Sequence, residues 1–360
     1  MPRLARRLVA VLAAALVAGC GGAQATVASA PRTPATVTSG SRTPATVGSG
    51  SRTPATVTSG PRTPAGQPLT QVASGIPTPT SFAFGDGQVF VGSAGGGARH
   101  SGGVYLLGHP SRRLAGSPPL VIGVTWHQGR LYLSGASRLQ MWSGFNGHGF
   151  TSRRTIYTGP PRFPGFNGLA FGADGRLYVG VGVSSDDDDD HGPTTRPYAR
   201  DLLSFNASGG DLKIVASGVR QPFQLAFPSG SSSPYVSVLG QDFGPGAANA
   251  PDFIIRARPG QNYGFPTCNW GGLSACGAFT RPLQLLRPHT NPVGLAILGG
   301  RLYFNEFGGR VPASVVSVPL GGGAITPAAI GFAQYIVGLG THGGALYVGE
   351  IDGRIFRVRP

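Results

Sequence analysis

The sequence predicts a six-bladed β-propeller, an all-β fold in which small sheets are arranged around a central axis. An apolar phrase recurs six times: a Gly-X-hydrophobic segment, a turn that contains Gly, and a short strand centred on an aromatic residue or Val. The strand centres are Phe90, Tyr132, Tyr178, Val236, Tyr303 and Tyr347. They lie roughly 42 to 67 residues apart, which suits one four-stranded blade with variable loops.

The turn inside each phrase is the second observation that predicts the fold. Five of the six phrases carry a short turn in the same place, at Asp86-Gly87, Gln128-Gly129, Asp174-Gly175, Gly299-Gly300 and Gly343-Gly344. These residue types tolerate the positive φ angles of tight hairpins. A sandwich with regular turns is the alternative, but it gives no reason for one turn chemistry to recur at one point of a repeat. We expect the aromatic strand residues in the blade cores.

The chain begins with a predicted lipoprotein signal peptide, residues 1–19. Arg3, Arg6 and Arg7 precede an apolar run that is too short to span a bilayer as a mature helix. The run ends in Val17-Ala18-Gly19-Cys20, which resembles a bacterial lipobox and implies cleavage before Cys20 and acylation of it. A plain signal peptide followed by an incidental Cys is the alternative. We expect an extracytoplasmic lipoprotein, anchored in the membrane of the cell envelope.

Residues 20–68 are predicted to form a tether without a packed core, and residues 69–360 the propeller. A decapeptide that begins Pro31-Arg32-Thr33-Pro34 repeats from Ser41 and Ser51 and breaks off after Pro64. Recurrent Pro blocks regular structure, and little apolar surface is available to offset the entropy of ordering. The Arg residues of the repeat could contact anionic lipid or an envelope glycan; a solvated spacer is the simpler interpretation.

The formal charge of +15 does not indicate a nucleic-acid-binding protein. Residues 1–68 hold seven Arg and no acid, which leaves 22 basic and 14 acidic residues, or +8, in the propeller. Five of those acids form one run, Asp186 to Asp190, which we expect to be a solvated loop tip in the third blade, with a weak Ca²⁺ site as the alternative. No basic stripe with interleaved aromatic residues is present. We expect a monomer that does not bind nucleic acid.

Cys268 and Cys276 are predicted to form a disulfide. They close a short Gly-rich loop in an exported chain, where conditions are oxidising. Two ligands are too few for a structural zinc site, and no His lies in the loop.

From Leu69 onward, several distinctive phrases follow one another in a fixed order. The most specific stretch runs from Gly240-Gln241-Asp242-Phe243-Gly244-Pro245 to Asn262-Tyr263-Gly264-Phe265-Pro266. The other phrases are Asn167 to Val179, Ala216 to Pro222, Pro288 to Leu295 and Gly353 to Val358. This ordered series resembles the glucose/sorbosone dehydrogenase family. The resemblance implies a six-bladed propeller that holds pyrroloquinoline quinone (PQQ) and Ca²⁺ over the axial funnel. It also implies a His base that takes the proton of a sugar hydroxyl.

The chain departs from the family pattern at chemically important positions. The resemblance places the catalytic His at Gly165, and the Asn expected after Arg220 is Gln221. The acidic-polar pattern after Asp252 becomes apolar, and an expected Arg is Gln334. Loss of the base alone would cost about 10²–10⁴ in rate.

The resemblance nevertheless implies a set of site residues, and each has a structural alternative. Arg220, Gln221 and His289 are the candidate catalytic residues, and Arg220, His289, Glu306 and Arg310 are the candidate cofactor ligands. Arg220 could instead anchor its own loop, His289 could bind a loop carbonyl, and Glu306 and Arg310 could form a salt bridge. A Ca²⁺ site would use Asp242, Gly244, Pro245 and Asp252; the alternative is a turn whose Asp residues cap loops.

Two classes of function follow from this comparison. The first is a membrane-tethered, PQQ-dependent dehydrogenase that oxidises a sugar or polyol. The second is a catalytically lapsed propeller that binds a carbohydrate, a quinone or a protein on the same face.

Overall fold

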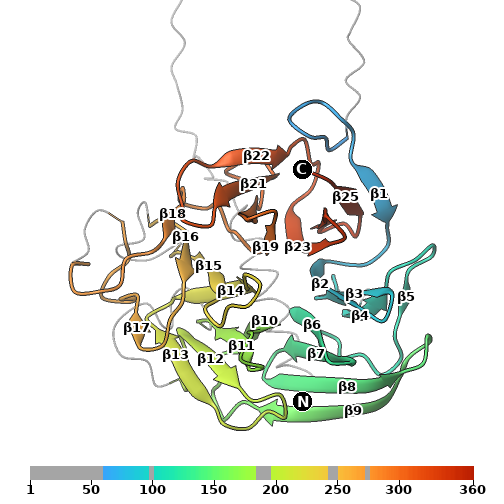
Figure 1. Ribbon diagram of the computed structural model, residues 1–360, viewed down its shortest axis with the longest axis horizontal. Helices are drawn as coiled ribbons and strands as arrows, with labels where there is room; N and C mark the ends of the chain where they lie inside the picture. The colour runs from blue at the N-terminus through green and yellow to red at the C-terminus, as the bar shows by residue number, and fades with distance from the viewer. Residues whose placement is uncertain (1–59, 97–100, 184–195, 242–249, 272–275) are drawn as a thin grey trace, which may run out of the picture.

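The computed structural model describes residues 60–96, 101–183, 196–241, 250–271 and 276–360. These residues form 25 β-strands in six sheets, which surround a central axis as the blades of a propeller (Figure 1). The predicted signal peptide, Cys20 and residues 20–59 of the tether lie outside the described residues. So do Asp242, Gly244, Pro245 and the run from Asp186 to Asp190.

Each sheet is built outward from one innermost strand. Blades 1 and 2 consist of β2 (Pro79–Gly85), β3 (Gln88–Ser93), β4 (Gly103–Leu106) and β5 (Arg112–Arg113), and of β6 (Gly123–His127), β7 (Arg130–Gly135), β8 (Arg138–Phe145) and β9 (Phe150–Thr158). Blades 3 and 4 consist of β10 (Phe166–Phe171), β11 (Leu177–Val181), β12 (Asp201–Phe205), β13 (Lys213–Ser217) and β17 (Gln261–Asn262), and of β14 (Gln221–Ala226), β15 (Tyr235–Leu239), β16 (Phe253–Arg256) and β18 (Gln284–Leu285). Blades 5 and 6 consist of β19 (Leu295–Leu298), β20 (Arg301–Glu306), β21 (Ser314–Pro319) and β22 (Thr326–Ala329), and of β23 (Ile336–His342), β24 (Ala345–Glu350), β25 (Ile355–Val358) and β1 (Thr70–Ala73).

The recurring phrase is the hairpin of the two inner strands in every blade. Four of its turns contain two residues that both have positive φ, as mirror-image hairpin turns require, at residues 86–87, 128–129, 299–300 and 343–344. The turn at Asp174-Gly175 differs from the prediction, because only Gly175 has positive φ and the loop between β10 and β11 is longer. All six strand centres are buried, as predicted.

The N-terminal strand β1 closes the ring. It pairs with β25, the strand nearest the C-terminus, so both ends of the propeller sequence lie in one sheet (Figure 1). Residues 60–68, which the sequence predicts to belong to the tether, also lie on the propeller. The backbone of Arg62 exchanges two hydrogen bonds of 2.9 Å with Ile330, and Pro61 is buried. The last copy of the Pro-Arg-Thr-Pro repeat therefore contacts the propeller.

Polar groups connect successive blades near the axis. Thr80 donates to the carbonyl of Val121, Asn167 to that of Pro222, and Asn305 to that of Ile336, over 2.8–2.9 Å. Each of these donors is buried. A buried polar group that finds its partner in the next blade fixes the angle between blades, because leaving it unpaired would cost about 1–3 kcal/mol.

The predicted disulfide between Cys268 and Cys276 is present. It closes the segment that follows β17, outside blade 3. Among the described residues, no helix is long and apolar enough to cross a membrane.

Candidate functional site

We call the end of the propeller at which the innermost strands begin the loop face. An apolar cluster fills its centre, because the residues before or at the start of several inner strands are aliphatic or aromatic. The buried members are Ala94, Leu120, Ile122, Phe223, Leu239, Val293, Phe307 and Val337. Tyr335 stacks on Phe307 at the edge of the cluster, with ring centroids 4.8 Å apart. Little of the cluster itself is exposed, and the partly buried Ala136, Tyr335 and Ile351 pack against it.

Several phrases of the family resemblance meet at the loop ends of blades 3 to 5. Arg220 donates to the carbonyl of Gly240 over 2.6 Å, and Gly240 donates its amide to Asp252 over 2.6 Å. The second carboxylate oxygen of Asp252 accepts from the amide of Asn291 over 2.7 Å. Arg220 and Asp252 are almost fully buried, with 5 % and 1 % of their surface exposed. Asp252 therefore joins β15 to the loop that leads into blade 5.

The Asn-Tyr-Gly-Phe-Pro phrase, residues 262–266, contacts Arg220 and its neighbour Arg200. Its first residue, Asn262, is the last residue of β17, which adds to the outer edge of blade 3 in parallel with β13. The guanidinium groups of Arg200 and Arg220 lie 5.4 and 5.9 Å from the centre of the Phe265 ring. Such cation–π contacts stabilise buried guanidinium groups. Arg220 therefore both anchors its loop and lies within a phrase that the family resemblance singled out.

Glu306 and Arg310 do not form the salt bridge that was the alternative for them. Glu306 pairs with Arg287 over 2.6 Å and accepts a hydrogen bond from Ser314. Arg310 instead lies 2.7 Å from Nε2 of His289 and is exposed at the rim of the loop face. His289 itself is held at a φ of 61°, an uncommon angle for a non-Gly residue.

The contact with Arg310 defines the proton positions on His289. A guanidinium can only donate hydrogen bonds, so Nε2 must be the acceptor and the proton of a neutral ring lies on Nδ1. The lone pair with which Nε2 would take a substrate proton is therefore already engaged. His289 could serve as a base only after this contact is broken.

Gly165, where the resemblance places the catalytic His, has a φ of 137°. A Cβ atom added there would lie 3.3 Å from the carbonyl oxygen of Ala136. Both features follow from the local structure, because the amide of Phe166 donates to that same carbonyl over 2.8 Å. The backbone at this position is thus one that glycine adopts readily and other residues rarely adopt.

Gln221 and Asp201 complete the polar residues of this region. The side-chain oxygen of Gln221 accepts from the amide of Val183 over 2.9 Å, so it supports the loop after β11. Burial raises the pKa of Asp201 to about 7, and the neighbouring Arg200 only partly opposes this shift. The sequence pattern did not single out Asp201 or Arg200, since neither lies in a matching phrase.

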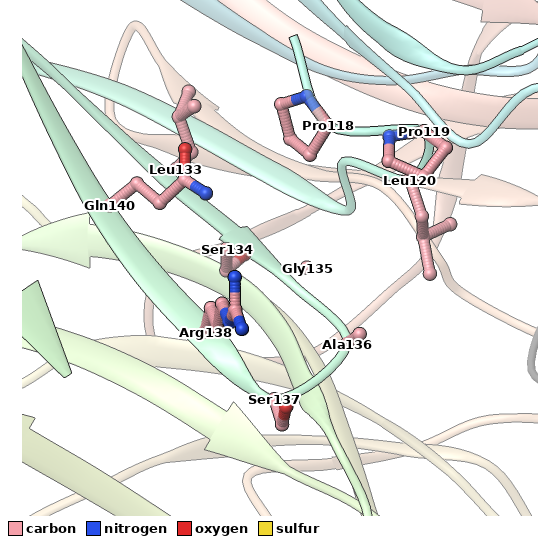
Figure 2. A pocket seen from close by; sticks show the side chains of 10 residues that line it. All are labelled: Pro118, Pro119, Leu120, Leu133, Ser134, Gly135, Ala136, Ser137, Arg138 and Gln140. Atoms are coloured by element: carbon pink, nitrogen blue, oxygen red, sulfur yellow. The ribbon is translucent and has the colours of Figure 1, made fainter. Parts of the chain in front are cut away.

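A cavity of about 330 Å³ opens beside Gly165, between the loop that leads into blade 2 and strands β7 and β8 (Figure 2). Its lining residues are Pro118, Pro119, Leu120, Leu133, Ser134, Gly135, Ala136, Ser137, Arg138 and Gln140. Among these lining residues, Ala136 is the one whose carbonyl accepts the hydrogen bond from the amide of Phe166. The sequence contained no signal for this cavity, because its walls come from a loop and two strands that only the fold brings together.

The residue types on the described part of the loop face match the chemical groups of PQQ. An anionic, planar quinone requires apolar contacts and cationic donors. The loop face supplies the partly buried Tyr335 and Ile351 above the apolar cluster, and the exposed Arg310 with its partner His289. Arg220 and Glu306 already have protein partners. For Ca²⁺, no group of three or more His, Cys, Asp or Glu side chains gathers within the described part of the chain. The Ca²⁺ site therefore remains a prediction.

Comparisons with known proteins agree on the fold. The PQQ-bound aldose sugar dehydrogenase of Streptomyces coelicolor is 19 % identical with a TM-score of 0.61, over 82 % of this chain and 97 % of that one. An oxidoreductase (glucose dehydrogenase) of Thermus thermophilus is 20 % identical with a TM-score of 0.62, over 80 % and 98 %. No protein-family model and no curated protein sequence matches the chain. The chain has the six-bladed propeller fold of these sugar dehydrogenases.

Proposed function

We propose that this chain is an extracytoplasmic propeller of the PQQ-dependent sugar dehydrogenase type, which binds a sugar or polyol on its loop face. The observation that carries the proposal is the convergence of Arg220, Gly240 and Asp252 with the phrase around Phe265. These residues are distant in sequence, and their phrases are the ones that the family resemblance selects from the sequence alone. Their direct contacts support the idea that the family scaffold is retained.

In this proposal, His289 and Arg310 would hold the cofactor over the apolar cluster. The guanidinium of Arg310 would pair with a carboxylate, and the imidazole would keep the guanidinium oriented through their 2.7 Å contact. PQQ, when bound, supplies the oxidising quinone, and the chain supplies orientation and exclusion of water. Ca²⁺ is part of the proposal through the predicted oxygen ligands.

A second function is favoured by two specific observations, Gly165 and the engaged Nε2 of His289. Together they remove the proton acceptor that the family resemblance implies, while the binding surface is kept. The second proposal is therefore a catalytically lapsed propeller that binds a carbohydrate or quinone without oxidising a sugar at a useful rate.

Dye reduction distinguishes the two proposals. Purified protein would be loaded with PQQ and Ca²⁺ and mixed with aldoses and polyols in the presence of an artificial electron acceptor. Turnover with any of them supports the dehydrogenase and shows that another group acts as base. Binding of the quinone with no turnover supports the lapsed propeller, and the absence of both rejects the cofactor proposal.

The membrane anchor belongs to the same proposal, because it places the propeller outside the cytoplasm. Cys20 would carry the lipid, and the repeat region would link it to the propeller. Cys20→Ser should then release the protein from the membrane fraction or block its processing. A membrane fraction that the substitution leaves unchanged would reject the anchor and leave the site proposal intact.

A further inference from the structure

The cavity beside blade 2 lies between a loop and a sheet. Pro118 and Leu120, from the loop that leads into blade 2, form an apolar wall. Arg138 and Gln140 of β8 lie on the opposite, sheet side, together with Leu133 of β7, which pairs with Gln140 in the sheet (Figure 2). We call this side the polar wall, because it holds the guanidinium and the amide. None of the lining residues is acidic.

The orientation of the Gln140 amide is determined by its neighbour. The indole nitrogen of Trp142 donates to Oε1 of Gln140 over 3.0 Å. Indole can only donate, so the oxygen of the amide must face Trp142 and the NH₂ group is left to face the cavity. Trp142 is fully buried, which holds this arrangement in place.

The polar wall is therefore rich in hydrogen-bond donors. Gln140 presents an NH₂ group and Arg138 a guanidinium, while Ser137 adds a hydroxyl. Within the described part of the chain, no hydrogen bond or ion pair of the Arg138 guanidinium is found, and the group is exposed at the mouth. A cavity with donors on one wall and hydrocarbon on the other complements an anion that has an apolar body.

We infer that this cavity is a binding site for a small amphipathic carboxylate, an acyl or aryl acid, distinct from the proposed sugar site on the axis. The carboxylate lies between Arg138 and Gln140, and the hydrocarbon part contacts Pro118, Leu120 and Leu133. A volume of about 330 Å³ is at the lower end of the range for small-molecule sites and admits an acid of roughly ten to fifteen non-hydrogen atoms. A free sugar fits poorly, since its hydroxyl groups would face hydrocarbon without partners.

Calorimetric titration with 4-phenylbutanoate tests the inference on the mature protein. Its neutral counterpart, 4-phenylbutan-1-ol, has the same hydrocarbon body and lacks the charge. We expect the acid to bind at least about tenfold more tightly than the alcohol, because hydrogen bonds to a charged group are worth more than neutral ones. Equal affinity for the two compounds, or no binding of either at millimolar concentration, would overturn the inference.

Two variants connect the binding to the polar wall. Gln140→Glu keeps an oxygen for Trp142 and replaces the NH₂ group by a carboxylate, so the fold is retained and the acid is repelled; affinity should fall at least about tenfold. Arg138→Gln should lower it similarly. Arg130→Gln, at the other end of blade 2 and also exposed, is the matched control and should change nothing. Binding that survives both wall variants would show that the acid sits elsewhere and refute the assignment. A PQQ titration run in parallel separates this outcome from a failure of the axial site.

Discussion

At the scale of single residues, Gly165 occupies the position at which the family resemblance expects the catalytic His. We predict that Gly165→His lowers stability by about 1–3 kcal/mol, because a φ of 137° is strained for a side chain with a Cβ atom. Urea denaturation measures the change. Gly165→Ala isolates the backbone cost and should be destabilised by a similar amount. Gly277→Ala is the control, since nothing lies near an added Cβ there. A fully stable Gly165→His variant would contradict this description of the backbone and make the restored base available for assay.

Asp201 gives a residue-scale prediction about pH. Its pKa in the folded protein is about 7, well above its value of about 3.9 in an unfolded chain. The folded protein therefore binds one proton more than the unfolded chain between about pH 4 and pH 7. The contribution of Asp201 to stability is fully present below about pH 4 and is lost as the pH rises through about 7. Within that interval the free energy of unfolding falls by about 1.4 kcal/mol for each pH unit.

Asp201→Asn should remove this dependence. The variant should gain stability relative to the original chain at pH 8 and show little gain at pH 4, as measured by urea midpoints across the range. Asp86→Asn, at an exposed turn, is the control. An equal effect of Asp201→Asn at both pH values would contradict the assigned pKa.

At the scale of elements, the propeller depends on contacts between neighbouring blades. Asp252 is the clearest case, since its two oxygens accept amide hydrogen bonds from Gly240 and Asn291. We predict that Asp252→Asn destabilises the protein by about 1–3 kcal/mol, because its NH₂ group would face one of those amides. Asp86→Asn, at an exposed turn, is the control. If Asp252 acts mainly as a Ca²⁺ ligand, a chelator should lower the stability of the original chain to that of the variant; otherwise the chelator should have no such effect.

The hairpins could be predicted from the sequence at this scale because their information is local. Gln128-Gly129 and Gly343-Gly344 specify their turns through two adjacent residues. The fifth strand of blade 3 could not be predicted in the same way. Gln261 pairs with Ala216 across more than forty residues, and two-residue strands have no period of their own. The orientation of Gln140 likewise depends on a contact with Trp142 that no motif encodes.

At the scale of the whole molecule, the ring is closed by a strand that carries no copy of the repeat. We predict that a chain starting at residue 60 keeps the stability of the mature protein. A chain starting at residue 74 should lose about 3 kcal/mol or more relative to one starting at residue 69, at roughly 1 kcal/mol for each ladder hydrogen bond between β1 and β25. The chain starting at 69 already lacks the pairing of Arg62 with Ile330, so this comparison isolates β1. Equal urea midpoints of these two chains would show that β1 does not contribute to closure.

The whole-molecule prediction of a six-bladed propeller succeeded because one phrase is repeated six times. The exact start of the domain was less accessible, since Pro61 to Pro64 reads as one more copy of the tether repeat. It is connected to the propeller by the backbone pairing of Arg62 with Ile330, far away in sequence. From the sequence, the site could be predicted only as a set of short matching segments, without the contacts between them. Which members would already be bonded to the protein, as Arg220 and Glu306 are, depended on the packing of several blades.

The loop face as a quinone-binding surface is the central claim, and a PQQ titration in the presence of Ca²⁺ tests it most directly. We predict a bound-quinone absorbance change that saturates at one PQQ for each protein, and a weaker affinity in Arg310→Gln. A spectrum that stays that of free PQQ, with no PQQ retained by the protein after gel filtration, would contradict the claim.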